Sequence, residues 1–206
     1  MLIAEQLMLL CIDPAVGEFE SARNHVDIDT LAAAALLFDL AEQKRLRFKA
    51  DFIAIDTNLP ISHPLLSAAI HALDGPGMHT DAAIDLLVAR LGSIPRQLLE
   101  SLFRRDVLHR VRASWWPWSP LRYPLRSLQA RNEAIAQIQA ATVSGDPSLR
   151  GSGLMLLADF AGRLTAALGG ATHETAAMKL LDLVHVRDDD PIERRLLARI
   201  RSIMLN

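Results

Sequence analysis

The sequence predicts a mainly α fold, built as a single compact helical domain with one or two small β-hairpins. Alanine and leucine are abundant, while aromatic residues make up only 5% of the chain, a balance that favours helices packed closely on helices. Several apolar runs repeat with the spacing of an amphipathic helix, and proline and glycine separate them. No internal repeat, low-complexity tract or interdomain linker interrupts residues 1–206, so one domain is expected.

The first two helices are expected at 5–12 and around 31–41. Residues 5–12 form a short apolar element that ends at 13–17, a segment whose proline and glycine favour a turn. Asp27 and Asp29 stand in N-capping positions ahead of the second run. Because 31–41 is apolar nearly all round, this helix should lie buried at the centre of the fold.

A small hairpin and three helices are expected next along the chain. Apolar and basic residues alternate over 46–50, and the apolar run 52–55 follows, a pattern typical of a two-stranded hairpin. Further helices are predicted at 65–73, at 84–91 after a Gly-Pro-Gly break, and from Ser93 with Pro95 in the first turn and Leu98, Leu99, Leu102 and Phe103 directed inward.

The rest of the chain combines a proline-rich segment with more helices. Residues 107–111 indicate a short extended piece, and the prolines within 112–124 exclude a helix interior there. The predicted helices are 132–142, the apolar run 154–168 capped by Gly151-Ser152-Gly153, 174–185, and a last one that begins at Asp190-Pro191 with the acidic run 188–190 as its cap.

Composition and charge exclude several classes of protein. Cys11 is the only cysteine, so no intramolecular disulfide can form, and the first residues lack the basic start of a signal peptide. The most apolar stretch, 154–168, is shorter than the ~20 residues of a spanning helix and contains Asp159 and Arg163. We therefore expect a cytoplasmic protein. A net charge of −2 argues against nucleic acid as a partner.

No pattern of residues indicates catalysis, a metal site or a cofactor. The seven histidines show neither an HExxH motif nor pairing with cysteine. GxSxG, Walker and GxGxxG patterns are absent from the sequence. The sequence therefore predicts a protein that binds a partner and is not an enzyme.

Basic residues are concentrated in one stretch of the chain. Residues 90–131 contain nine arginines and no lysine, against two acidic residues, Glu100 and Asp106. The planar guanidinium suits phosphate, and clustered cations near an anionic bilayer contribute roughly 1 kcal/mol each. A phosphate-bearing lipid surface is one reading of this stretch. A solvated basic face without a ligand, nucleic acid and an acidic protein surface are the alternatives.

All three tryptophans lie inside this basic stretch, at Trp115, Trp116 and Trp118, between prolines that indicate a hairpin. Tryptophan prefers the boundary between water and hydrocarbon, where its ring is partly buried and its N–H stays hydrated. The hairpin is therefore expected to project and insert among lipid headgroups. In the alternative it folds back on the core or packs against another subunit.

The residue pattern resembles the Golgi phosphoprotein 3 family over most of the chain. The likeness is carried by 5–13, by 36–41 with 44–46, and by 102–108, where Asp106 takes the place of a family glycine ahead of a β-hairpin. The resemblance implies a monomeric or self-associating helical fold that binds phosphatidylinositol 4-phosphate at a membrane. It also implies contacts with the cytosolic tails of membrane enzymes, as in eukaryotic members, and a hairpin that serves membrane contact and oligomer formation.

The family's headgroup residues match this sequence only in part. The resemblance places a family tryptophan and three arginines near Asn24, Ala33, Gly92 and Pro95. Arg23 and Arg96 lie one position away from two of these places. With the basic stretch included, the predicted headgroup-binding residues are Arg23, Arg96, Arg104, Arg105, Arg110, Arg112 and Arg122, and the predicted membrane-inserting residues are Trp115, Trp116 and Trp118.

The sequence thus predicts a non-enzymatic, cytoplasmic, peripheral membrane protein that binds anionic phospholipid and acts as an adaptor for membrane proteins. The tryptophan hairpin is expected on the face that carries Arg104, Arg105, Arg110, Arg112 and Arg122. The alternative is a protein-interaction or homo-oligomerisation module that uses the same hairpin without lipid.

Overall fold

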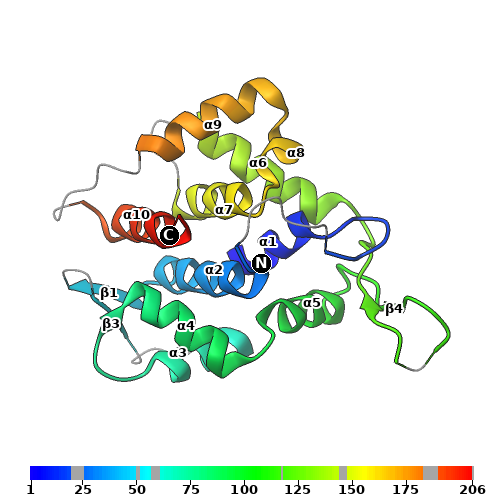
Figure 1. The fold of residues 1–206 in the computed structure, drawn as a ribbon, viewed down its shortest axis with the longest axis horizontal. Helices are drawn as coiled ribbons and strands as arrows, with labels where there is room; N and C mark the ends of the chain where they lie inside the picture. Colours follow the sequence, from blue (N-terminus) through cyan, green and yellow to red (C-terminus); the bar gives the residue numbers. More distant parts are fainter. Residues whose placement is uncertain are drawn as a thin grey trace.

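Two buried helices, α1 (Ile3–Cys11) and α2 (Ile28–Glu42), pack against each other at the centre of the computed structural model (Figure 1). The structure describes residues 1–19, 26–49, 52–56, 61–116, 118–143, 148–182 and 190–205. Every residue of α1 is buried, and so is α2 from Leu31 to Ala41. Helices without a polar face have to be enclosed by other elements, and the predicted central position of 31–41 is confirmed.

The other helices surround this pair, and the mainly α prediction is confirmed. α1 also contacts α5, α6 and α7, while α2 contacts α4, α7 and α10. In Figure 1, α3 and α4 lie below the central pair, and α8 and α9 lie above it. Their bounds are α3 Pro64–Leu73, α4 Thr80–Leu91, α5 Ile94–Arg104, α6 Gln129–Val143, α7 Leu149–Phe160, α8 Leu164–Leu168, α9 Gly170–Asp182 and α10 Ile192–Met204.

Two small antiparallel sheets lie at the edges of the helical body. The predicted hairpin is formed by β1 (Leu46–Lys49) and β2 (Phe52–Ile55), with Leu46 opposite Ile55. The sequence did not indicate β3 (Met78–His79), which pairs with β2 and gives the order β1-β2-β3. A strand of two residues is too short to show alternation. The second sheet pairs β4 (Val111–Arg112) with β5 (Leu121–Arg122).

Three predicted helix boundaries are wrong. The apolar run 154–168 is not one helix, because Gly162 takes a φ of 69° between α7 and α8, a conformation that ends a helix. Gly151-Ser152-Gly153 does not cap α7 but lies buried inside it, and Ser148 is the cap, with its Oγ accepting the Gly151 N–H at 3.2 Å. α10 has Pro191 and not Asp190 at its N-cap position.

Two glycines inside α7 allow other helices to approach it closely. A Cβ at Gly151 would lie 2.8 Å from the Ala141 Cβ on α6 and 3.1 Å from the carbonyl oxygen of Gln137. A Cβ at Gly153 would lie 3.0 Å from the ring of Phe38 on α2. Glycine lowers helix propensity by about 1 kcal/mol relative to alanine, so here close packing outweighs propensity.

We expect Gly151→Ala to lower the free energy of unfolding by about 1–3 kcal/mol, because overpacking at a backbone contact exceeds the gain in helix propensity. Urea denaturation measures the change. Removing the opposing methyl group in Ala141→Gly/Gly151→Ala should recover part of the loss. A single variant as stable as the parent would contradict the close α6–α7 packing.

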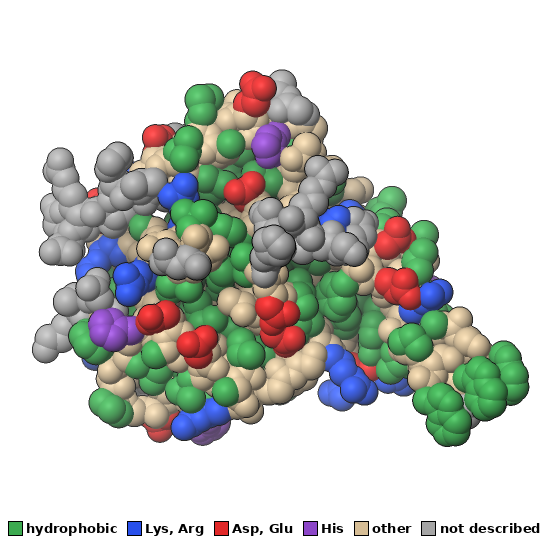
Figure 2. Space-filling model, viewed as in Figure 1, with side chains coloured by type: hydrophobic (Ala, Val, Ile, Leu, Met, Phe, Trp, Pro, Cys, Tyr) green, Lys and Arg blue, Asp and Glu red, His purple; other side chains and the backbone are tan. Residues whose placement is uncertain are grey.

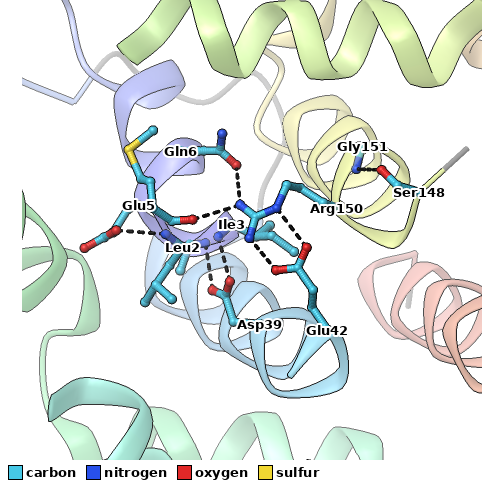
Figure 3. Close-up of polar contacts among 11 residues, drawn as sticks. Leu2, Ile3, Glu5, Gln6, Asp39, Glu42, Ser148, Arg150 and Gly151 are labelled. Atoms are coloured by element: carbon cyan, nitrogen blue, oxygen red, sulfur yellow. Dashed lines mark hydrogen bonds and ion pairs between the residues drawn. The ribbon is translucent and has the colours of Figure 1, made fainter. Parts of the chain in front are cut away.

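Carboxylates from α2 and from α1 itself accept the buried N–H groups at the N-terminus of α1 (Figure 3). The Asp39 carboxylate accepts the N–H groups of Ile3 at 2.7 Å and Ala4 at 3.0 Å, and Glu5 accepts the N–H of Leu2 at 2.9 Å. The first N–H groups of a helix have no partner within the helix, and none can reach water here. Arg150 joins α7 to the same corner through Glu42, Gln6 and the carbonyl oxygen of Met1.

Burial raises the pKa of Asp39 from 3.8 to about 7, in spite of the two N–H groups that it accepts. The folded protein therefore binds more protons than the unfolded chain between about pH 4 and pH 7, and its stability should fall as the pH rises through that interval.

Asp39→Asn removes this titration, so its stability should depend less on pH over the same interval. We expect the difference in unfolding free energy, wild type minus variant, to decrease by up to about 4 kcal/mol as the pH rises, at about 1.4 kcal/mol for each pKa unit. Chemical denaturation at a series of pH values measures it. Parallel profiles for the two proteins would rule out an Asp39 carboxyl that ionises near neutral pH.

Candidate functional site

The β4–β5 hairpin carries the three tryptophans, and backbone hydrogen bonds hold its two strands together. Val111 pairs with Arg122, and below that pair the His109 N–H donates to the Pro124 carbonyl at 2.8 Å. Toward the tip, the Ala113 N–H donates to the Pro120 carbonyl at 3.0 Å. Residues 113–116 and 118–120 therefore lie at the tip of a hairpin whose strands are held by backbone hydrogen bonds.

The base of the hairpin packs on the turn that follows α1. The Tyr123 N–H donates to the Gly17 carbonyl at 2.9 Å, and the Leu125 N–H donates to the Pro14 carbonyl at 3.0 Å. Gly17 has a φ of 75°, and a Cβ there would lie 2.1 Å from the Pro124 nitrogen. Only glycine allows so close an approach with this backbone conformation.

Side chains of α5 fix the base of the hairpin from the other side. Tyr123 is buried, and its hydroxyl donates to Glu100 Oε1 at 2.6 Å. Arg110 donates to the two carboxylate oxygens of Glu100 at 3.2 and 3.1 Å and lies 4.5 Å above the ring of Phe103. The hydrogen bond from Tyr123 lowers the pKa of Glu100, and burial together with this bond raises the pKa of Tyr123 to about 12.

The three tryptophan side chains project from the helical body into solvent. Their exposed fractions are 83% for Trp115, 51% for Trp116 and 82% for Trp118. The rings stack on one another, with centroids 4.9 Å and 5.9 Å apart. In Figure 2, hydrophobic side chains stand at the far end of the lobe on the right, where Figure 1 shows the hairpin that contains β4. The prediction that this hairpin projects is confirmed.

The predicted basic residues divide into paired and unpaired groups. Arg105, Arg110 and Arg122 form ion pairs with Glu5, Glu100 and Glu18 respectively. Arg96 and Arg104 are exposed and form no ion pair with the residues that the structure describes. Arg112 lies on β4, and Arg23 lies outside the described residues.

The ion pairs Arg105–Glu5 and Arg122–Glu18 could not be predicted from the sequence of the arginine-rich stretch. Glu5 and Glu18 lie about a hundred residues before their partners in the chain. Local charge counting therefore overstated the free positive charge on this face. The roles of Tyr123 and Gly17 at the base of the hairpin were missed as well, because a single tyrosine and a single glycine give no spacing signal.

Two surface hollows flank α5, and Arg96 borders both. The first, of about 510 Å³, lies between the turn after α1, the start of α2 and the hairpin base. The second, of about 550 Å³, lies between the start of α3 and α5, and its lining includes His63, Arg104 and Arg105.

The first hollow contains little of the positive charge that a headgroup site requires. Asp29 lines it and accepts the Ile94 N–H at 3.0 Å, so a carboxylate from within the chain already occupies the N-terminus of α5. Asp27 and Asp29 were both predicted to cap α2. The side chain of Asp29 bonds to the first residue of α5 instead, and Asp27 occupies the N-cap position of α2 without a side-chain cap bond. Pro95 lines the hollow, and Ala33 is fully buried. Asn24 lies outside the described residues.

The comparison with known families agrees with this architecture. Residues 3–198 match the profile of the Golgi phosphoprotein 3 (GPP34) family, which is nearly the whole chain. The chain belongs to the Golgi phosphoprotein 3 family. A search of curated proteins found no match. The resemblance seen in the sequence is thereby confirmed.

Two further features of the described part of the chain bear on this Golgi phosphoprotein 3-like protein. None of the helices there combines the length and apolar character needed to cross a bilayer. Within the same residues, His, Cys, Asp and Glu side chains do not gather in threes as a metal site would require.

We expect Gly17→Ala to loosen the base of the hairpin, because the added Cβ would meet the Tyr123–Pro124 backbone. Gly169→Ala is the matched control, since Gly169 has a φ of 74° but no atom near its would-be Cβ. Both variants carry backbone strain, and only Gly17→Ala adds a clash. Gly17→Ala should therefore lower the free energy of unfolding, measured by urea denaturation, by about 1–3 kcal/mol more than Gly169→Ala does.

Limited digestion with trypsin reports on the hairpin itself, since Arg112 and Arg122 lie on its two strands. Gly17→Ala should be cleaved there faster than Gly169→Ala. Equal cleavage and equal stability of the two variants would show that the close contact at Gly17 does not hold the hairpin.

Proposed function

We propose that this protein is a non-enzymatic peripheral membrane protein that binds anionic phospholipid through the tryptophan hairpin and the basic residues beside it. The observation that supports this most strongly is the exposure of three stacked tryptophans at the tip of a hairpin whose base is fixed to the body. A contiguous apolar group held away from the core is typical of a surface that meets another apolar phase.

The physical chemistry of the hairpin favours a membrane interface. Indole rings partition to the boundary between headgroups and acyl chains, where the N–H remains hydrated. Arg112 on β4 supplies a cation on the hairpin itself, and Arg104 is the last residue of α5, the helix whose Glu100 holds the hairpin base. Arg110 and Arg122 are ion-paired, yet their side chains stay 43% and 34% exposed and can reach phosphate as well. An apolar insertion and an electrostatic contact together bind better than either alone.

Family membership supports a lipid ligand of this class and, by resemblance, phosphatidylinositol 4-phosphate. It also supports an adaptor role toward the cytosolic tails of membrane proteins. The first hollow carries a carboxylate where the resemblance implies arginines. We therefore propose binding to anionic phospholipid generally, with phosphatidylinositol 4-phosphate as the family's candidate among them.

Replacing Trp115, Trp116 and Trp118 together by alanine should strongly reduce flotation with phosphatidylcholine vesicles that contain phosphatidylserine or phosphatidylinositol 4-phosphate. The fold should remain intact, because exposed tip side chains make few core contacts. Binding of the wild type should also weaken with salt, since charges beyond about 8 Å are screened at physiological ionic strength.

Val143→Ala/Met178→Ala/Leu181→Ala is the matched control, because it removes exposed apolar side chains from α6 and α9 and leaves the hairpin unchanged. Flotation that is equal for wild type and the tryptophan variant would remove the insertion mechanism. Sedimentation of both proteins without lipid tests the alternative. An oligomer that dissociates only in the tryptophan variant, together with no flotation of the wild type, would favour the homo-oligomerisation module.

A further inference from the structure

The three indole rings at the tip of the β4–β5 hairpin form a stack whose two end faces are open. Trp116 lies in the middle, with its ring centroid 4.9 Å from that of Trp115 and 5.9 Å from that of Trp118, at interplanar angles of 20° and 19°. The outer two side chains are far more exposed than the middle one. Trp115 and Trp118 therefore each present one flat ring face to solvent.

An open indole face attracts cations, and it selects among them. The π-electrons make the face of the ring negative, and tryptophan binds cations more strongly than tyrosine or phenylalanine does. A primary ammonium group is strongly hydrated and has to give up hydrogen bonds to water before it meets the ring. A quaternary ammonium has no N–H group and loses no such bonds, and aromatic side chains commonly recognise it. A trimethylammonium group is therefore the cation that fits these faces best.

The charges near the stack disfavour a ligand that is only a cation. Residues 113–120 contain no aspartate or glutamate that could neutralise it. Arg112 is the last residue of β4 and lies three positions before Trp115, and Leu121 stands opposite it on β5. Its guanidinium would repel a bare cation at the tip, whereas a ligand with a negative group beside its ammonium would pair with it. The hairpin therefore matches a zwitterion.

We propose that the hairpin binds the phosphocholine headgroup of a bilayer lipid, with the trimethylammonium on the open faces of Trp115 and Trp118 and the phosphate at Arg112. The two opposite charges of this headgroup match an indole face and a guanidinium that stand on one short hairpin. The guanidinium donates to phosphate oxygens in a planar fork. The indole faces contribute the selectivity, because phosphate is common to all phospholipids.

The inference rests on the proposed function and names a headgroup for it. Anionic lipid supplies a general attraction to the basic residues, and phosphocholine is the group that the tip itself recognises. Insertion of the tip requires apolar area, which an aliphatic side chain also provides. The cation–π contact requires an aromatic ring. Aliphatic and aromatic replacements of the outer tryptophans therefore distinguish the two mechanisms.

Flotation of the full chain with two kinds of vesicle tests the choice of headgroup. Both contain the same fraction of phosphatidylserine, and the remaining lipid is phosphatidylcholine in one and phosphatidylethanolamine in the other. We expect the wild type to bind the phosphatidylcholine vesicles about fivefold more tightly, the ratio that corresponds to an exposed cation–π contact. Using this ratio for each protein removes differences in overall membrane affinity.

Trp115→Leu/Trp118→Leu removes both open ring faces and keeps large apolar side chains at the tip. Trp115→Phe/Trp118→Phe is the matched control, because it changes the same two positions and keeps aromatic faces there. The ratio should fall to about one in the leucine variant and stay between one and the wild-type value in the phenylalanine variant. Both variants should fold like the wild type, since these side chains are more than four-fifths exposed.

Saturation-transfer NMR separates recognition of the headgroup from an effect of lipid packing. The full chain is mixed with soluble phosphocholine or with phosphoethanolamine, and the transfer from protein to ligand protons is compared. We expect clear transfer from the wild type to the choline methyl protons, a several-fold smaller transfer from the leucine variant, and little transfer to phosphoethanolamine.

The outcomes separate this inference from the proposed function. A wild-type ratio near one, the same ratio in the leucine variant, or the same NMR transfer from the wild type and the leucine variant would overturn the phosphocholine site. The proposed function would survive each of these results, provided that flotation of the wild type still depends on the tryptophans. A wild type that binds neither kind of vesicle would overturn both.

Discussion

A helix enclosed on every side has to find partners for its terminal N–H groups within the protein, and α1 imposes this requirement on the whole fold. Asp39 on α2 accepts two of these groups, and Glu5 accepts a third. Glu5 in turn bonds to Ser101 on α5 and to Arg105, the residue that follows α5. Unsatisfied buried donors are costly, so the core tolerates few other arrangements of these elements.

The same requirement connects the core to the proposed binding surface. Glu5 fixes α5 by its inner side, and Glu100 on α5 fixes Tyr123 and Arg110 at the base of the hairpin. The tryptophan loop is therefore attached through two successive carboxylates to the most buried helix of the molecule. The carboxylates of Glu5 and Glu100 in this way engage four cationic or hydroxyl groups, those of Ser101, Arg105, Tyr123 and Arg110.

The sequence predicted those features that depend on local pattern. An apolar run without a polar face identified the centre at 31–41, and three tryptophans among prolines and arginines identified the projecting hairpin. Features that the apolar and charge patterns do not reveal were missed. The break at Gly162 depends on a positive φ that the apolar pattern conceals, and the glycines at 151 and 153 resemble a cap although they serve close packing. The pairing of Arg105 and Arg122 with Glu5 and Glu18 requires the tertiary structure.

Placing every tryptophan of the chain in one loop gives the protein a built-in optical reporter. Indole emission comes from this loop alone, with no contribution from a buried tryptophan in the helical body. Transfer of the rings into a less polar phase would shift that emission to shorter wavelength, whereas melting of the body would change it little. Spectroscopy of the unlabelled protein can therefore separate events at the tip from unfolding of the core.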